Sequence, residues 1–122
     1  MAEQDLLIRP ATSEPRMLPS NLEAEAAFLG AVLIDNRVIE ELPVNLTPTH
    51  FFEPIHGRIY ERVLQLLDRK AVVTPVTLRP YFESDEALKE LGGVAYLARL
   101  TADGQGLLAP RELAEQIYEL AL

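Results

Sequence analysis

Residues 22–35, which read LEAEAAFLGAVLID, constrain the fold most strongly because they predict a helix that is apolar on nearly every side. Only Glu23 and Glu25 are charged, and both fall in the first turn, where acidic side chains suit the positive end of the helix dipole. Ser20 and Glu23 form a capping-box pattern, and Asn21 is the alternative N-cap. A helix without a polar face is surrounded by neighbours on several sides. We therefore expect this helix to be the centre of an all-helical core.

One residue of that predicted helix indicates tight packing. Gly30 stands in the helix interior, where glycine is about 1 kcal/mol less favourable than alanine. A glycine at such a position has no side chain to keep a neighbouring backbone away. We therefore expect another helix to approach this one closely at Gly30.

The charge balance limits the partners that the chain can bind. Its 122 residues include 19 acidic and 11 basic side chains, which gives a net charge of -8. Affinity for nucleic acid comes largely from lysine and arginine, so neither duplex DNA nor an anionic membrane is expected to be the main partner. The chain has no cysteine, which excludes disulfides and thiolate metal sites and fits a reducing compartment. No apolar run reaches the roughly 18 residues that span a bilayer, and the N-terminus lacks the apolar core of a signal peptide.

Prolines, glycines and capping residues divide the rest of the chain into a tail and several short helices. No stretch alternates between apolar and polar residues for long enough to predict a strand, so the expected fold class is all-α, a compact multi-helix bundle. In the first half of the chain we expect a flexible tail over residues 1–19 and, after the central helix, a short helix capped by Asp35 or Asn36. A turn or 3₁₀ segment over 47–52 should present Phe51 and Phe52 to the core. A helix from Pro54 to Arg69 should follow it.

The second half of the chain is predicted to contain four further helices. Thr74 is expected to cap the first, and Pro80 should kink or end it because the proline ring opposes the carbonyl four residues back. The second helix, over 84–91, is supported by an Asp85–Lys89 pair and ended by Gly92 and Gly93. The third is an apolar helix over 94–100, and the fourth runs from Pro110 to the end. A loop over 101–108, with Gly104 and Gly106, separates these last two helices.

The last predicted helix has a wide apolar face and reaches Leu122 without a polar cap or a glycine. Glutamates at positions 112, 115 and 119 lie together on its opposite side. We expect that the chain stops inside a helix and that the apolar face meets a partner subunit or sequence that is not present. The face consists of Leu113, Ala114, Ile117, Tyr118, Leu120 and Ala121, and the candidate interface residues are Leu113, Ile117, Tyr118 and Leu120.

The sequence offers no set of residues typical of an active site. The neighbouring glutamates at positions 23 and 25, and those at 40 and 41, diverge from a helix and cannot act as carboxylate pairs. His50 and His56 match no metal-binding motif, and we expect His56 on the polar side of its helix and His50 in the preceding turn. The glycines form no phosphate-binding loop, and there is no nucleophile elbow. No catalytic, cofactor-binding or metal-binding residues are therefore predicted.

A stripe of polar side chains on the helix over 54–69 leaves two interpretations open. Arg58, Arg62 and Arg69 are either a solvated helix face, which we favour, or a contact for an anion or a nucleic acid.

Two tyrosines also leave two interpretations open. Tyr96 and Tyr118 are either core residues with their hydroxyls at the surface or aromatic anchors of an interface.

Four segments resemble motifs of a known family and stand in the same order, and the similarity covers residues 18–122. The resemblance is to the N-terminal domain of DnaB-type bacterial replicative DNA helicases. The segments are LPSNLEAEAAFLGAVLIDN over residues 18–36, Phe51-Phe52 followed by His56-x-x-Ile59-Tyr60, VTPVTL over residues 73–78 and LGGVAYL over residues 91–97.

The resemblance implies both an architecture and a role. Residues 20–108 would form the helical bundle, and residues 109–122 the first arm of a dimerisation hairpin whose second arm lies beyond Leu122. Such domains pair into a collar on a hexameric ring that unwinds DNA in the bacterial cytoplasm, and primase docks on the collar. ATP and magnesium bind a separate motor domain that also makes most of the DNA contacts, and a helicase loader acts on the parent protein. This fragment would itself be non-catalytic, without a cofactor and without contact to a membrane.

Two alternatives come from other classes of protein. The first is a helical nucleic-acid-binding module that uses Arg58, Arg62 and Arg69. The second is an adaptor domain from an unrelated helical family. An enzyme has no residues in this sequence to support it.

Overall fold

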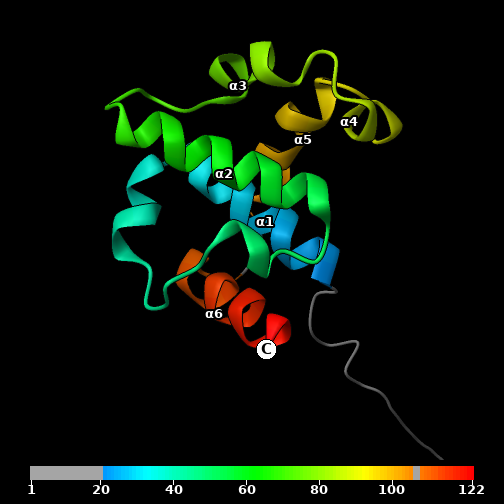
Figure 1. Cartoon of the computed structure of the whole chain (residues 1–122). Coiled ribbons are helices and arrows are strands. Elements are labelled where there is room, and N and C mark those ends of the chain that lie inside the picture. Colours follow the sequence, from blue (N-terminus) through cyan, green and yellow to red (C-terminus); the bar gives the residue numbers. More distant parts are fainter. Residues whose placement is uncertain (1–20, 106–107) are drawn as a thin grey trace, which may run out of the picture.

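The structure is a computed structural model that describes residues 21–105 and 108–122, and every regular element in these ranges is helical (Figure 1). The all-α prediction is confirmed for this part of the chain. No helix within it combines the length and apolar character needed to cross a bilayer. The predicted tail, the Ser20 cap and Gly106 lie outside the described residues. The elements are α1 (Asn21–Ile34), η4 (Asn36–Glu41), η5 (Pro48–His50), α2 (Pro54–Asp68), α3 (Pro75–Phe82), α4 (Glu86–Glu90), α5 (Ala95–Asp103) and α6 (Pro110–Ala121).

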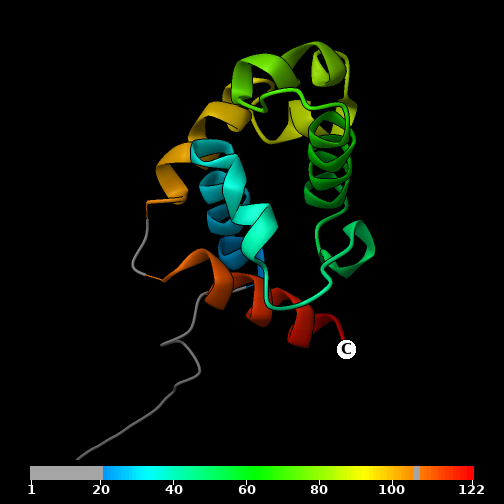
Figure 2. The same ribbon diagram turned by 90° about the vertical axis from the view of Figure 1, so that its left-hand side faces the viewer.

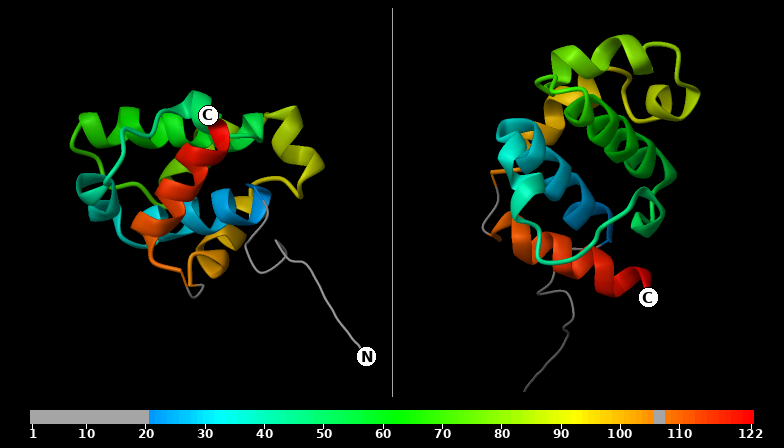
Figure 3. Two further views of the ribbon diagram at one scale, coloured as in Figure 1. Left: turned by 90° about the horizontal axis from the view of Figure 1, so that it is seen from below. Right: turned by 60° about the vertical axis from the view of Figure 1, so that its left-hand side comes forward.

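Helix α1 is the centre of the bundle, as its composition predicts. Its side chains are buried on several sides, and α5 and α6 make the most extensive contacts with it. Seen from below, α6 lies across α1 (Figure 3). Helices α3 and α4 lie at the end of the molecule opposite α6 (Figure 2). The bundle therefore has two distinct ends, one formed by α6 and the other by α3 and α4.

Gly30 lies where the backbones of α1 and α5 meet, so the predicted close approach is confirmed. A Cβ atom on Gly30 would stand only 1.7 Å from the carbonyl oxygen of Leu100. The same contact involves Gly104, whose Cβ atom would stand 2.4 Å from the backbone nitrogen of Ala31. Two glycines on opposite helices thus allow the backbones to touch.

Most predicted boundaries agree with the structure, including the helix starts at Pro54 and Pro110, whereas two helices end later than expected. Asp35 caps η4, Thr74 caps α3, and Gly92 and Gly93 turn the chain with positive φ angles of 113° and 74°. Pro80, however, does not end α3, which continues to Phe82 because Leu78 and Phe82 are both buried in the core. Similarly, α5 continues to Asp103 through the first part of the predicted loop, because the close contact with α1 holds its last turn in place.

The predicted Asp85–Lys89 pair is wrong. The Asp85 carboxylate instead caps α4 by accepting a hydrogen bond from the Leu88 N–H at 3.0 Å, and it accepts two more from Arg58 at 2.8 Å. Lys89 lies 3.5 Å from the exposed Glu86 carboxylate. A tertiary contact with α2 therefore replaces the local pair that the sequence suggested.

Only one of the two neighbouring phenylalanines enters the core. Phe51 is 8% exposed, whereas Phe52 is 68% exposed, so the prediction that both point inward is wrong for Phe52. The backbone at Phe51 is extended, with φ -79° and ψ 131°, and successive side chains of an extended segment point to opposite sides. Phe52 is therefore presented at the surface.

Candidate docking site

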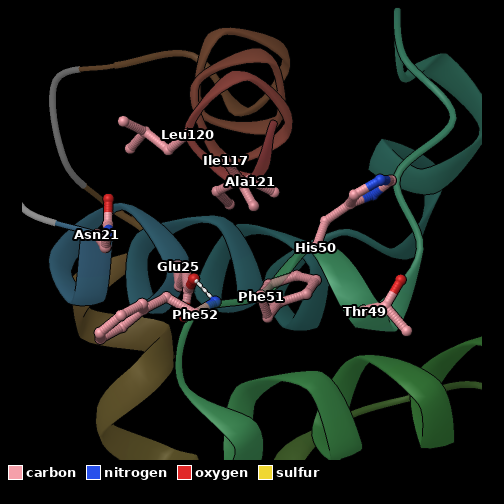
Figure 4. Close-up of a pocket in the computed structure, with 9 residues that line it drawn as sticks. All are labelled: Asn21, Glu25, Thr49, His50, Phe51, Phe52, Ile117, Leu120 and Ala121. Carbon is pink, nitrogen blue, oxygen red and sulfur yellow. Dashed lines mark hydrogen bonds between the residues drawn. The ribbon is translucent and has the colours of Figure 1, made fainter.

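A hollow of about 270 Å³ opens between α6, the first turns of α1 and the segment around Phe51. Figure 4 shows the α6 residues facing the phenylalanine segment across this hollow, with Asn21 and Glu25 of α1 at its side. We call it the α1–α6 hollow. It is lined by Asn21, Glu25, Thr49, His50, Phe51, Phe52, Ile117, Leu120 and Ala121.

Large apolar side chains are exposed at and beside the α1–α6 hollow. Phe52 and Leu120 line it and are 68% and 55% exposed, and Leu122, directly after the lining residue Ala121, is 86% exposed. Clustered apolar side chains of this size at one place on a surface are typical of contacts with another protein. The exposed apolar side chains at and beside the hollow are therefore a candidate protein-docking surface.

The structure places the four predicted interface residues of α6 in different environments. Leu113 and Ile117 are 3% and 2% exposed because they pack in the domain's own core. Tyr118 is half-buried and meets the ring of His50 edge-on, with 4.9 Å between ring centroids. Leu120 alone of the four is fully at the surface. The apolar face predicted to be open is thus largely covered by the domain's own core, and its open part is the end near Leu122.

A buried polar network lies directly behind the hollow, and sequence reasoning missed it. The Glu25 carboxylate, from α1, accepts hydrogen bonds from the backbone N–H groups of Phe52 and Glu53 at the start of α2. Its Oε1 atom also lies 2.8 Å from Nδ1 of His56. Since Glu25 is 2% exposed and His56 is 1% exposed, the prediction of His56 on a polar helix face is wrong. A carboxylate of α1 thus binds both the segment that leads into α2 and a side chain of its first turn.

Tyr96 of α5 completes this network. Its hydroxyl lies 2.6 Å from Nε2 of His56, and the two rings stack with their planes 12° apart. The side chain is 9% exposed, and burial raises the pKa of its hydroxyl. Tyr96 is therefore a core tyrosine that joins α5 to α1 and α2, and three helices share one polar contact.

Spacing along the helices carried a signal for this network. Glu25 precedes Leu29 and Val32 at intervals of four and three residues, so it belongs to a buried face of α1. His56 precedes Ile59 and Val63 in the same manner on α2. A glutamate and a histidine that each lead a buried stripe are candidates for a buried pair. The spacing does not reveal that Glu25 and His56 face each other in the folded chain.

The arginines of α2 lie at a second, smaller cleft. The Arg58 guanidinium is paired with the Asp85 carboxylate, and Arg62 lies over the Tyr81 ring at 4.3 Å from its centroid. Both arginines line a cleft of about 170 Å³ between α2 and the end of α3. Arg69 is exposed just beyond the C-terminus of α2. The structure thus brings Arg58 and Arg62 together at the cleft, and Arg69 stands apart from them beyond the end of α2.

Neither histidine stands among metal ligands. Nδ1 of His50 accepts a hydrogen bond from the backbone N–H of Thr47 at 2.9 Å, in the turn where the sequence placed it. Over residues 21–105 and 108–122, no three histidine or acidic side chains are grouped as a metal site would require.

Comparison with known proteins identifies what the chain resembles. Residues 17–119 match the family model described as "DnaB-like helicase N terminal domain". The replicative DNA helicase DnaB of Rickettsia typhi is 37% identical over 110 residues, which are 90% of this chain and 22% of that protein. That of Geobacillus stearothermophilus is 36% identical over 104 residues, 85% of this chain and 23% of that protein. The chain thus spans less than a quarter of the length of these relatives.

Two solved structures share the fold. The N-terminal domain of DnaB helicase from Mycobacterium tuberculosis superposes with a TM-score of 0.68 and 27% identity, covering 84% of this chain and 75% of that one. The other is described as "The Structure Of A DnaB-Like Replicative Helicase And Its Interactions With Primase". It superposes with a TM-score of 0.66 and 29% identity, covering 82% of this chain and 24% of that one.

Proposed function

Because the chain belongs to the family of DnaB-like helicase N-terminal domains, we propose that it is the assembly and docking domain of a hexameric replicative DNA helicase. In this role the domain performs no chemistry. ATP and magnesium bind a motor domain of the same protein, which also makes most of the contacts with DNA. The protein acts at the replication fork in the bacterial cytoplasm, where a helicase loader places it on DNA.

The observation that carries this proposal is the concentration of exposed apolar side chains at the α1–α6 hollow. Phe52, Leu120 and Leu122 are more than half exposed, and burying apolar surface stabilises a contact by roughly 25 cal/mol for each Å². A second copy of this chain is the occupant that the helicase assignment implies, because a hexameric ring needs contacts between identical subunits. The α6 end of the domain is therefore the surface through which copies meet.

Primase is the second partner in the proposal. The description of one solved relative names its interactions with primase, and that relative shares the fold over 82% of the present chain. In this proposal the helical bundle makes the contact, so the chain should bind primase without the motor domain.

Calorimetric titration of a bacterial primase with the 122-residue chain tests the primase contact. Saturable binding with a defined stoichiometry is the expected result. Heats no larger than those of dilution, at concentrations where both proteins stay folded, would overturn the primase contact. Titration with a Leu120→Asp variant shows whether primase and the second copy use the same end of the domain.

The two alternatives drawn from the sequence are weaker. Membership of the family excludes an adaptor from an unrelated helical family. A nucleic-acid module would need several neighbouring arginines free to contact phosphates, but Arg58 is paired with Asp85 and the acidic Glu61 lines the same cleft as Arg62. The net charge of -8 also repels a polyanion.

A further inference from the structure

Positive charge is concentrated on one part of an otherwise acidic domain. Residues 54–82, which include α2 and α3, contain five basic and two acidic side chains, whereas the whole chain has 11 basic and 19 acidic ones. Helix α3 lies at the end of the molecule opposite α6 (Figure 2). This surface is thus separate from the α1–α6 hollow, and it attracts a different kind of partner.

The cleft between α2 and α3 holds one arginine ready for an anion. Arg62 lies 4.3 Å from the centroid of the Tyr81 ring, and within the described part of the chain its guanidinium forms neither a hydrogen bond nor an ion pair. An arginine held over an aromatic ring keeps the N–H groups of its edge available for a carboxylate. Holding it in place beforehand lowers the entropy lost on binding.

The surroundings of Arg62 favour separate carboxylates over a continuous phosphate backbone. Arg58 is already neutralised by Asp85, and the exposed Glu61 also lines the cleft, so a polyanion would meet negative charge there. Further along the same stripe of α2 stands Arg69, seven residues after Arg62 and therefore about 10 Å away along the helix axis. Two cations at this spacing match two acidic side chains on one peptide.

We propose that the α2–α3 cleft binds an acidic segment of another protein, with one carboxylate on Arg62, a second near Arg69 and an apolar side chain against Tyr81. The aromatic wall formed by Tyr81 and Phe82 supplies the apolar contact, and Tyr81 is 43% exposed. This surface is additional to the α6 end, so the domain binds two kinds of partner at opposite ends.

NMR titration of the ¹⁵N-labelled 122-residue chain tests the proposal. The probe is a synthetic helical peptide with two glutamates seven residues apart and a leucine between them. Shifts at Arg62, Tyr81 and Arg69 that weaken as salt is added are the expected result. A matched peptide with both glutamates changed to glutamine should lose the interaction.

Two arginine variants locate the contact. Arg62→Gln should weaken peptide binding by about tenfold, because it removes a charge-assisted hydrogen bond. Arg79→Gln is the matched control, since Arg79 is exposed on α3 and does not line the cleft, and it should bind like the parent. Circular dichroism confirms that both variants are folded.

Any of three results would overturn the proposal. The glutamine peptide could bind as tightly as the acidic one, or Arg79→Gln could lose as much affinity as Arg62→Gln. A single-stranded DNA oligonucleotide could also cause the same shifts while the acidic peptide causes none, in which case the cleft is a nucleic-acid contact.

Discussion

The Glu25 carboxylate in α1 lies 2.8 Å from the His56 imidazole in α2, and both side chains are almost fully buried. The carboxylate only accepts hydrogen bonds, so Nδ1 of His56 is the donor. Because Glu25 also binds the backbone N–H of Phe52, it fixes the segment that turns Phe51 inward and Phe52 outward. The shape of the α1–α6 hollow therefore depends on a polar contact behind it.

Removing Glu25 should destabilise the domain substantially. In a Glu25→Ala variant, the buried His56 loses its partner, and the backbone N–H groups of Phe52 and Glu53, just before α2, lose their acceptor. Breaking a buried pair in this way typically costs about 3–5 kcal/mol. Guanidinium denaturation of the parent and the variant measures the loss of unfolding free energy.

A surface glutamate provides the comparison for that measurement. Glu90 is exposed at the end of α4, and Glu90→Ala should change the unfolding free energy by about 0.5 kcal/mol or less. Equal effects of the two substitutions would mean that the Glu25 network does not hold the three helices together.

Gly30→Ala should destabilise the domain although alanine is the better helix former. Propensity alone would favour the substitution by about 1 kcal/mol. The new Cβ atom would instead stand 1.7 Å from the Leu100 carbonyl oxygen, so α1 and α5 must move apart. Forced overpacking of this kind typically costs about 1–3 kcal/mol. A melting temperature equal to or higher than that of the parent would contradict the close helix contact.

Acid should weaken the attachment of α4 to α2 through Asp85. Partial burial alone would raise the pKa of Asp85, but the hydrogen bond from the Leu88 N–H and the Arg58 guanidinium outweigh it, so the pKa is lowered. A carboxyl whose pKa is lower in the folded state stabilises the fold above its unfolded pKa. That stabilisation is lost as the pH falls through the folded pKa.

Stability measured against pH checks this statement. The parent should lose stability as the pH falls below the ordinary aspartate pKa of about 3.9, and an Asp85→Asn variant should lose less over the same interval. Identical slopes for the two proteins would show that Asp85 does not contribute. Because the Arg58 side chain of this pair is 45% exposed and solvent screens the interaction, we expect a small difference.

The central helix and the positions of most other helices could be predicted because local patterns determine them. The apolar run of α1, the Thr74 cap and the Gly92–Gly93 turn act within a few residues of chain. Pro80 shows where such reasoning fails. Its local effect is to end a helix, but α3 continues because Leu78 and Phe82 are buried by residues distant in the sequence.

The candidate sites were harder to predict because they depend on contacts between distant residues. The apolar face of α6 was visible in the sequence, but Leu113 and Ile117 proved to be covered by the core of the same chain. The Arg58–Asp85 pair joins residues 27 positions apart, and the Glu25–His56 pair joins residues 31 positions apart. No local spacing reveals which distant side chain will be the partner.

Self-association of the 122-residue chain, measured by sedimentation equilibrium over a range of concentrations, tests the proposed assembly role most directly. The test variant is Leu120→Asp, because Leu120 is 55% exposed at the hollow, whereas the buried Ile117 could not be changed without disturbing the core. The control is Val76→Asp, because Val76 is 77% exposed on α3 at the other end of the domain. The average mass of the parent and of Val76→Asp should rise with concentration, and that of Leu120→Asp should stay closer to the monomer. A parent chain that remains monomeric throughout, or equal behaviour of the two variants, would contradict assembly through the α6 end.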